Sequence, residues 1–125
     1  MYEEDRYSMR ALVLLYMANK QGEVENSQMK RELKQITDCC GKNGLYISLD
    51  FIELGNDDLY SKPFNYIMGK LTDLEYVKMY YGDGKIAYEI NENVAKELSD
   101  RNSVFLREFS ENELNILQDA VHSVK

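Results

Sequence analysis

The residue types that most often carry catalysis are sparse in this sequence. The one histidine, His122, stands alone near the C-terminal end, so no serine or cysteine is predicted to have the base that nucleophilic catalysis requires. The stretches "GKNG" and "GDG" lack the length of a phosphate-binding loop. We therefore predict no catalytic residue, and we expect that the protein is not an enzyme.

Residues that could bind a metal ion are also few. Cys39 and Cys40 are adjacent and have no CxxC spacing, which favours two ordinary thiols in a reducing compartment over a zinc site or a disulfide. One group of carboxylates lacks the spacing of a calcium loop: Asp50, Glu53, Asp57 and Asp58. The sequence thus predicts no metal site and no other cofactor.

The charge distribution restricts the possible partners. The net charge of the 125-residue chain is −7, and the only basic excess lies in residues 29–43, with four basic and two acidic residues. Residues 44–61 carry four acidic residues and no basic one. This average disfavours tight nonspecific binding to nucleic acid but allows a local binding face. With no apolar run of membrane-spanning length and an acidic start, "MYEEDRY", we expect a cytoplasmic protein that enters no membrane.

Apolar residues at helical spacing predict helices over 5–20, 27–36, 61–73, from Asn91 onwards and over 111–124, with a break at 99–103 and a short strand in "GEVE" at 22–25. The predicted caps are Asn26 or Ser27, Ser61, Asn91, and Ser110 with Glu113 in a capping box. The predicted core residues are Met9, Leu12, Val13, Tyr16 and Met17; Met29, Leu33 and Ile36; Phe64, Ile67, Met68, Leu71 and Leu74; Val94, Leu98, Phe105 and Leu106; and Leu114, Leu117, Val121 and Val124.

A β-hairpin is predicted in the stretch "LEYVKMYYGDGKIAYEIN" at 74–91. Asp83-Gly84 is a favoured pair for a type I′ turn. That turn places apolar or aromatic pairs on one face: Tyr81 with Ile86, Met79 with Tyr88, and Val77 with Ile90. Since a two-stranded hairpin is marginal in water, this face is expected to pack on the helices.

Residues 37–60 allow two interpretations. The stretch "SLDFIEL" at 48–54 favours a short extra helix with Leu49 and Ile52 directed inward. The overlapping stretch "LYISLDF" could equally be a strand with Leu45, Ile47, Leu49 and Phe51 alternating. We expect the helix.

The order of these elements and the stretch "SKPFNYIMGKLTDLEYVKMYYGDGKIAYEINENVAKEL" at 61–98 resemble the winged-helix family of helix-turn-helix proteins, including MarR-like and PadR-like transcriptional regulators. Leu71, Leu74, Tyr76 and Val77 match the junction between a recognition helix and its wing. The resemblance implies a mainly α fold with a small β-hairpin wing. The resemblance covers residues 5–98. We predict a winged-helix domain over 1–98 with an inserted segment at 37–60, followed by a C-terminal helical extension over 99–125. We expect the helices 5–20 and 111–124 to form a homodimer contact.

The resemblance also implies that the 61–73 helix enters the major groove of double-stranded DNA. The DNA-binding residues it implies are Lys62, Asn65, Tyr66 and Lys70 on that helix, Lys30, Arg31 and Lys34 on the preceding helix, and Lys85 at the wing tip. These side chains could instead be simply solvated or paired with nearby carboxylates. The alternative function is an acidic winged-helix protein-interaction module, such as a plasmid or phage accessory or inhibitor protein. This module would bind a protein partner through exposed tyrosines and would not bind DNA.

Overall fold

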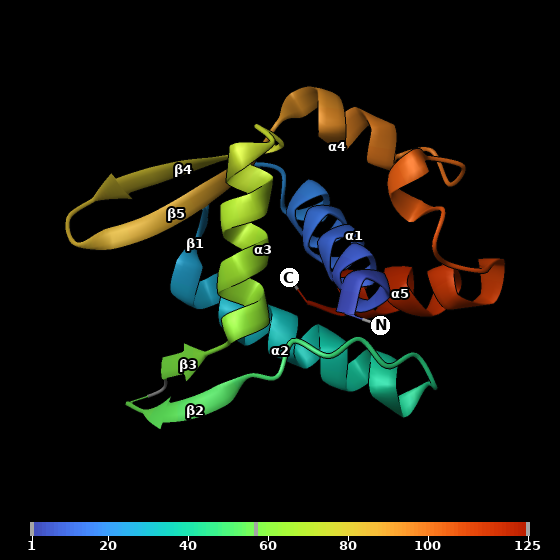
Figure 1. The fold of residues 1–125 in the computed structure, drawn as a ribbon, viewed down its shortest axis with the longest axis horizontal. Coiled ribbons are helices and arrows are strands. Elements are labelled where there is room, and N and C mark those ends of the chain that lie inside the picture. Colours follow the sequence, from blue (N-terminus) through green and yellow to red (C-terminus); the bar gives the residue numbers. More distant parts are fainter. Residues whose placement is uncertain (1, 57, 125) are drawn as a thin grey trace.

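The computed structural model describes residues 2–56 and 58–124, with side chains from residue 8 onwards. In this part of the chain the fold is mixed α/β (Figure 1), with five α-helices, a three-stranded antiparallel sheet and a two-stranded hairpin. The elements are α1 (Tyr2–Lys20), β1 (Val24–Glu25), α2 (Asn26–Lys42), β2 (Ile52–Gly55), β3 (Asp58–Tyr60), α3 (Lys62–Asp73), β4 (Val77–Gly82), β5 (Lys85–Ile90), α4 (Glu92–Leu98) and α5 (Glu111–Ser123), with one turn of 3-10 helix at Val104–Leu106. Over the described residues, none of these helices combines the length and apolar character needed to cross a bilayer.

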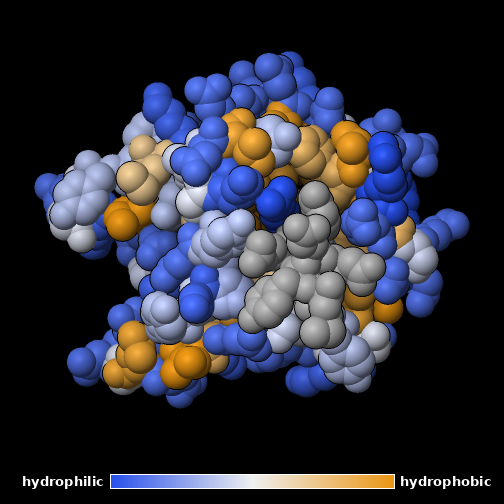
Figure 2. Space-filling view, viewed as in Figure 1, coloured by the Kyte–Doolittle hydropathy of each residue, from blue (hydrophilic) through white to orange (hydrophobic). Residues whose placement is uncertain are grey.

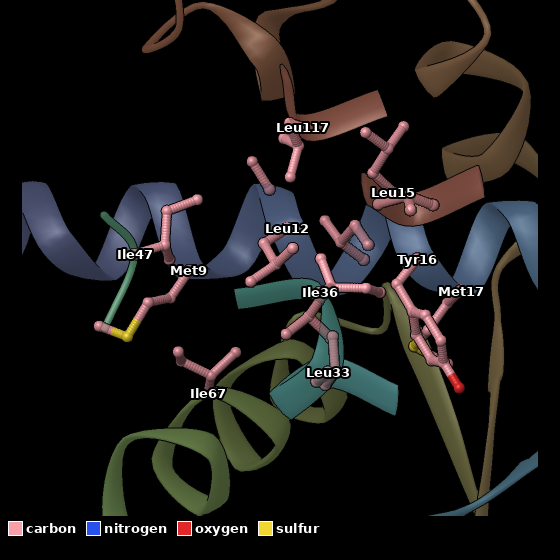
Figure 3. Close-up of a cluster of buried hydrophobic side chains, with 14 of the residues drawn as sticks. Met9, Leu12, Leu15, Tyr16, Met17, Leu33, Ile36, Ile47, Ile67 and Leu117 are labelled. Atoms are coloured by element: carbon pink, nitrogen blue, oxygen red, sulfur yellow. The ribbon is translucent and has the colours of Figure 1, made fainter. Parts of the chain in front are cut away.

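Helix α1 is the centre of the core. Every residue from Ala11 to Met17 is buried, so the helix contacts neighbours all round. Figure 3 shows its side chains meeting Leu33 of α2, Ile67 of α3 and Leu117 of α5. The predicted apolar stripes of these helices are confirmed. Leu74 is an exception, because α3 ends at Asp73 and leaves Leu74 41% exposed at the helix end.

A polar cluster joins α1 to α2 at the edge of this core. The Tyr16 hydroxyl donates a hydrogen bond to Glu32, and Lys20 Nζ lies 3.0 Å from the same carboxylate. Gln28 Nε2 also donates to Glu32, over 3.3 Å. Burial, and next the hydrogen bond to Glu32, raise the pKa of Tyr16. The cluster therefore holds Tyr16 in its neutral form.

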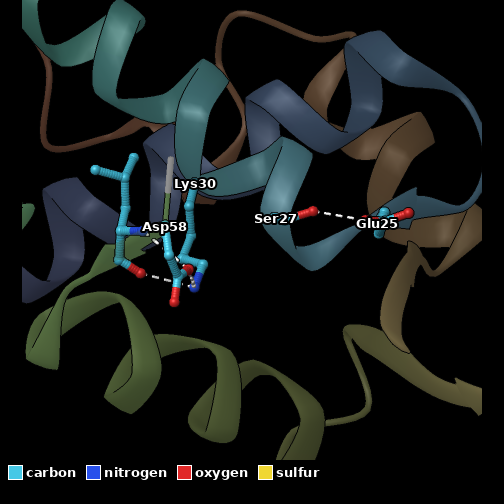
Figure 4. A network of polar contacts seen from close by, with 5 residues as sticks. Glu25, Ser27, Lys30 and Asp58 are labelled. Atoms are coloured by element: carbon cyan, nitrogen blue, oxygen red, sulfur yellow. Dashed lines mark hydrogen bonds and ion pairs between the residues drawn. The ribbon is translucent and has the colours of Figure 1, made fainter. Parts of the chain in front are cut away.

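Helix α2 differs from the prediction at both ends. The expectation that Asn26 or Ser27 caps it is wrong, because Glu25 holds the cap position without a side-chain cap bond. The Ser27 hydroxyl instead donates to Glu25 over 2.5 Å (Figure 4). The helix also runs six residues past the predicted end at residue 36, to Lys42, because buried Cys40 continues the apolar stripe one turn beyond Ile36.

The hairpin β4–β5 has the predicted register. Tyr81 pairs with Ile86, Met79 with Tyr88 and Val77 with Ile90, and Asp83 and Gly84 have the positive φ angles (53° and 74°) that a type I′ turn requires. The short strand β1 adds to β5, which gives the sheet order β1-β5-β4. The expected packing of the whole apolar face is wrong for the outer half of the hairpin, which extends past the helices (Figure 1) and leaves Met79 50% and Tyr81 73% exposed.

Residues 43–56 and 58–61 form neither a helix nor a simple loop. The expected helix at 48–54 is wrong. Leu45, Ile47 and Leu49 are buried in alternation along an extended segment, and a hairpin of β2 and β3 follows. The pattern of the competing strand interpretation is therefore present up to Leu49, but no described strand pairs with this segment. Ile52, predicted to face inward, is 56% exposed.

The C-terminal elements follow the prediction closely. Asn91 caps α4, this helix ends at Leu98, and Ser110 and Glu113 form the capping box of α5. The α5 stripe is buried against α1 and α2. The apolar face of this helix is therefore covered within one chain.

Candidate nucleic-acid interface

Helix α3 is fixed at its start by the segment that precedes it. The Ser61 side chain accepts a hydrogen bond from the Phe64 backbone N–H (3.0 Å) and donates its own to the Leu49 carbonyl. Pro63 lies in the first turn, where its missing N–H has no intrahelical partner to lose. Four residues then hold the inner face of the helix against the core: Phe64, Ile67, Met68 and Leu71. Both the position and the rotation of α3 are thereby set.

The outer face of α3 is polar and open. Lys62, Asn65, Tyr66 and Lys70 are all exposed, as the sequence predicts. A Cβ added at Gly69 would meet no atom within 4 Å, so the helix surface is low and accessible at that point. Neither Lys62 nor Lys70 forms an ion pair with a side chain that the structure describes.

The sequence predicts that Lys30 lies on an open face, and this prediction is wrong. Its side chain is only 14% exposed, because Nζ lies 2.8 Å from the Leu59 carbonyl oxygen and 3.4 Å from Asp58 Oδ1 (Figure 4). The β2–β3 hairpin therefore uses this cation to attach itself to α2. Lys30 is available to a phosphate only if the hairpin releases it.

The other two basic residues of α2 lie beside acidic groups. Lys34 pairs with Asp38 over 3.3 Å, and exposed Arg31 lies in the same hollow. The hollow has a volume of about 590 Å³ and is closed on its other side by the β2–β3 hairpin, including Glu53 and Asp58. Arg31 and Lys34 are thus in a mixed-charge environment apart from the open face of α3.

The wing contributes one basic residue near its tip. Lys85 is 69% exposed, and its Nζ lies 3.9 Å from Glu25. The hydrogen bond from Ser27, and next the charge of Lys85, hold the pKa of Glu25 below its ordinary value. On the same hairpin, the Tyr80 hydroxyl donates to Glu89 over 2.9 Å, and this hydrogen bond raises the pKa of Tyr80. Lys85 remains accessible because the ion pair is long and exposed.

The structure therefore divides the predicted residues into groups. It brings Lys62, Asn65, Tyr66 and Lys70 together on one helix, places Lys85 on the neighbouring wing, and sets Lys30, Arg31 and Lys34 against the acidic hairpin. No set of three or more histidine, cysteine or acidic side chains among the described residues is arranged to hold a metal ion. Comparison with models of known protein families, with curated proteins and with solved structures finds no match for this chain.

The sequence prediction missed a group of exposed apolar residues on the β2–β3 hairpin. Ile52, Leu54 and Tyr60 are 56%, 60% and 42% exposed. The pair Gly55-Asn56, with φ angles of 90° and 54°, is the local signal that could have indicated a turn between two strands here.

Proposed function

We propose that the protein is a winged helix-turn-helix regulator that binds double-stranded DNA in the cytoplasm, with α3 in the major groove and β4–β5 as the wing. The observation that carries this proposal is the outer face of α3, where four polar side chains of suitable chemistry stand exposed around Gly69. A single α-helix fits the major groove, and a flat polar face allows close approach to base edges. The element order and the three-stranded sheet are compatible with such a fold.

Each residue of this face has a role in the proposal. Asn65 offers the donor and acceptor pair that matches adenine, and Lys70 supplies a positive charge for guanine or phosphate. The Tyr66 hydroxyl can donate to a phosphate oxygen. Lys62, at the start of the helix, and Lys85, on the wing, approach the backbone on either side.

The proposal predicts that the affinity for DNA falls only weakly as the salt concentration rises. Because the chain carries −7 overall and the docking face offers only a few cations, the slope of affinity against salt corresponds to few phosphate contacts. Discrimination between sequences must then come mainly from α3. A homodimer is part of the proposal, since paired half-sites would raise this discrimination. Its contact would use surfaces other than the apolar stripes of α1 and α5, which are buried within each chain.

The test is fluorescence anisotropy with labelled duplex DNA from the region upstream of the protein's own coding sequence, beside a scrambled duplex, at low and near-physiological salt. Lys70→Glu should weaken binding to the native duplex by at least about tenfold, since it replaces an attraction to phosphate with a repulsion. Lys96→Glu is the matched control, because Lys96 also lies exposed in the last turn of a helix, α4, and the change in net charge is the same.

Two results would overturn the proposal. One is an affinity for the native duplex that Lys70→Glu leaves unchanged. The other is equal binding of the native and scrambled duplexes at both salt concentrations. Thermal unfolding of both variants, followed by circular dichroism, checks that neither substitution unfolds the chain.

A further inference from the structure

An apolar and a polar contact with α2 hold the β2–β3 hairpin in place. Leu59 is 7% exposed and packs toward α2, although it lies outside the main hydrophobic core. Lys30 of α2 makes the polar contact, because its Nζ lies 2.8 Å from the Leu59 carbonyl oxygen and 3.4 Å from Asp58 Oδ1. Figure 2 shows hydrophobic residues on the surface at the lower left, where Figure 1 places this hairpin, so its other apolar side chains face solvent. An element that buries so little apolar surface can open at a much smaller free-energy cost than global unfolding.

The hairpin stands between α2 and the start of α3, with a hollow on each side. On one side Glu53 closes a hollow of about 590 Å³ whose other wall includes Arg31 and Lys34 of α2. On the other side the hairpin borders a hollow of about 430 Å³, whose far wall includes Lys62 and Tyr66 of α3. The hairpin therefore separates the basic residues of α2 from those of α3, and close packing on either side of it is limited.

The base of the hairpin is held firmly. Leu49 and Ser61, which lie on either side of it in the sequence, are buried, and the Ser61 hydroxyl donates a hydrogen bond to the Leu49 carbonyl. Phe51 packs on the core, with its ring centroid 6.1 Å from that of Phe64. Because these contacts lie outside the two strands, the strands can move away from α2 while α3 keeps its cap and its position.

The closed hairpin keeps two basic residues of α2 from an approaching phosphate. The side chain of Lys30 is only 14% exposed. Arg31 is exposed, but it faces the hollow that Glu53 and Asp58 close, and those carboxylates would repel a phosphate backbone. Lys34 is less affected, because its ion-pair partner lies on α2 itself. Opening of the hairpin would uncover Lys30 and remove both carboxylates from beside Arg31.

We propose that the β2–β3 hairpin is an autoinhibitory cover over a phosphate-contacting face of α2. This inference rests on the proposed DNA binding by α3. While the hairpin is closed, α3 and the wing contact the duplex; when it opens, Lys30 and Arg31 bind the DNA backbone as well. Phosphate contacts carry no sequence information, so opening raises the affinity for any duplex and steepens its dependence on salt. The closed hairpin thereby limits sequence-independent binding.

The experiment compares two Leu→Ser variants of the full chain. Leu59→Ser removes the apolar contact with α2 and leaves the net charge unchanged. We expect amide hydrogen exchange in β2 and β3 to become at least about tenfold faster, while exchange in α1 and α3 stays as in the wild type. In fluorescence anisotropy the variant should bind both the native and the scrambled duplex at least about threefold more tightly. The slope of log affinity against log salt should steepen by about one unit or more.

Two controls assign this gain to the uncovered cations. Leu54→Ser makes the same chemical change in the same hairpin, but Leu54 is 60% exposed, so it should leave exchange and affinity within about twofold of the wild type. Adding Arg31→Gln to Leu59→Ser should remove more of the gain than adding Lys96→Gln, which removes the same charge from exposed α4.

Three results would overturn the inference. One is faster exchange in β2 and β3 without a gain in affinity, because the closed hairpin would then not inhibit binding. Another is a loss of affinity, since the hairpin itself would then contribute to binding. The third is an equal gain from Leu54→Ser. Gly55→Ala strains the turn, where φ is 90°, and also leaves the charge unchanged, so it is the second way to open the hairpin if Leu59→Ser unfolds the chain.

These outcomes are distinct from failure of the DNA-binding proposal. Preferential binding of the native duplex that Lys70→Glu weakens, without a gain from Leu59→Ser, overturns the cover alone. A gain on both duplexes in a protein that does not prefer the native one supports the cover and overturns the sequence-specific regulator. Absence of binding to either duplex by the wild type and by both opened variants overturns both proposals.

Discussion

The two hairpins of this protein are built alike and placed differently. Both are antiparallel, both have an apolar face, and both turn at a glycine with positive φ, Gly84 at 74° and Gly55 at 90°. The wing β4–β5 has six residues in each strand, gains a third strand, and buries Val77, Tyr88 and Ile90 at its root. The β2–β3 hairpin has strands of four and three residues and an irregular register, and it buries one residue, Leu59.

The two hairpins differ in how firmly they are anchored to the rest of the fold. A two-stranded ribbon is marginal alone, so the wing is held by burial at its root and by the edge partner β1. The β2–β3 hairpin is held by Leu59 and by Lys30, whose Nζ reaches the Leu59 carbonyl. Its apolar residues consequently remain available, and its opening should require much less free energy than global unfolding.

The largest expected difference between the hairpins is in the free energy of unfolding. Ile90→Ala removes buried methyl groups at the wing root and should lower the global free energy of unfolding by about 2–3 kcal/mol. Ile52→Ala makes the same chemical change on the open face, where Ile52 is 56% exposed, and should cost less than about 0.5 kcal/mol. Urea unfolding followed by circular dichroism measures both. Equal costs would show that the open face of β2 is covered in solution.

The same contrast explains how much of the fold was predictable. The wing was predicted residue by residue because local turn chemistry at Asp83-Gly84 and the alternation around it agree on one register. In residues 45–54 the local signals conflict. The burial of Leu45, Ile47 and Leu49 depends on packing against helices distant in the sequence, which no period of two or 3.6 can indicate.

The candidate site was predictable to a similar extent. Phe64, Ile67 and Leu71 define the inner face of α3, so its outward residues could be read directly from the helical period. Lys30 fits the same kind of argument on α2, yet β3 covers most of its side chain through Asp58 and Leu59, which lie 28 and 29 residues later. The position of an inserted hairpin is a tertiary property, and so is the loss of this cation from the open surface.

The second prediction compares the residues through which each hairpin enters its following helix. Ser61 is fully buried and bonds both to Phe64 N–H and to the Leu49 carbonyl, whereas Asn91 is exposed and accepts from the Asn93 N–H. Ser61→Ala should lower the free energy of unfolding by about 1–2 kcal/mol, because it removes the cap and leaves a buried carbonyl unpaired. Asn91→Ala should cost about 0.5–1 kcal/mol, since water can replace the lost bond. A larger loss of unfolding free energy for Asn91→Ala than for Ser61→Ala would contradict the role of Ser61 in joining the inserted segment to α3.

The third prediction concerns the glycines at the two turns. Gly84→Ala should lower the global free energy of unfolding by about 1 kcal/mol, because its φ of 74° strains a residue that has a Cβ. Gly55→Ala introduces similar strain, but the weakly anchored β2–β3 hairpin can relieve it by opening locally. Its effect should therefore appear as faster amide hydrogen exchange in β2 and β3. Gly82→Ala, in β4 with open space around it, is the control and should cost less than Gly84→Ala. Equal global costs for Gly55→Ala and Gly84→Ala would show that both hairpins unfold only with the core.

The smallest expected effect tests whether the wing root belongs to the core in solution. Burial raises the pKa of Tyr88 above its ordinary value of 10.0, so the unfolded chain loses this proton at lower pH than the folded chain. The associated stability is complete below about pH 10 and is lost as the pH rises through the higher folded value. Tyr88→Phe should therefore reduce the decline in the free energy of unfolding between pH 9 and 11, measured by urea unfolding. Tyr16→Phe should reduce it further, because burial and the Glu32 hydrogen bond raise the pKa of Tyr16 in the same direction. If Tyr88→Phe leaves this decline unchanged while Tyr16→Phe reduces it, the wing root frays before the core unfolds. The wing would then resemble the β2–β3 hairpin in its local stability.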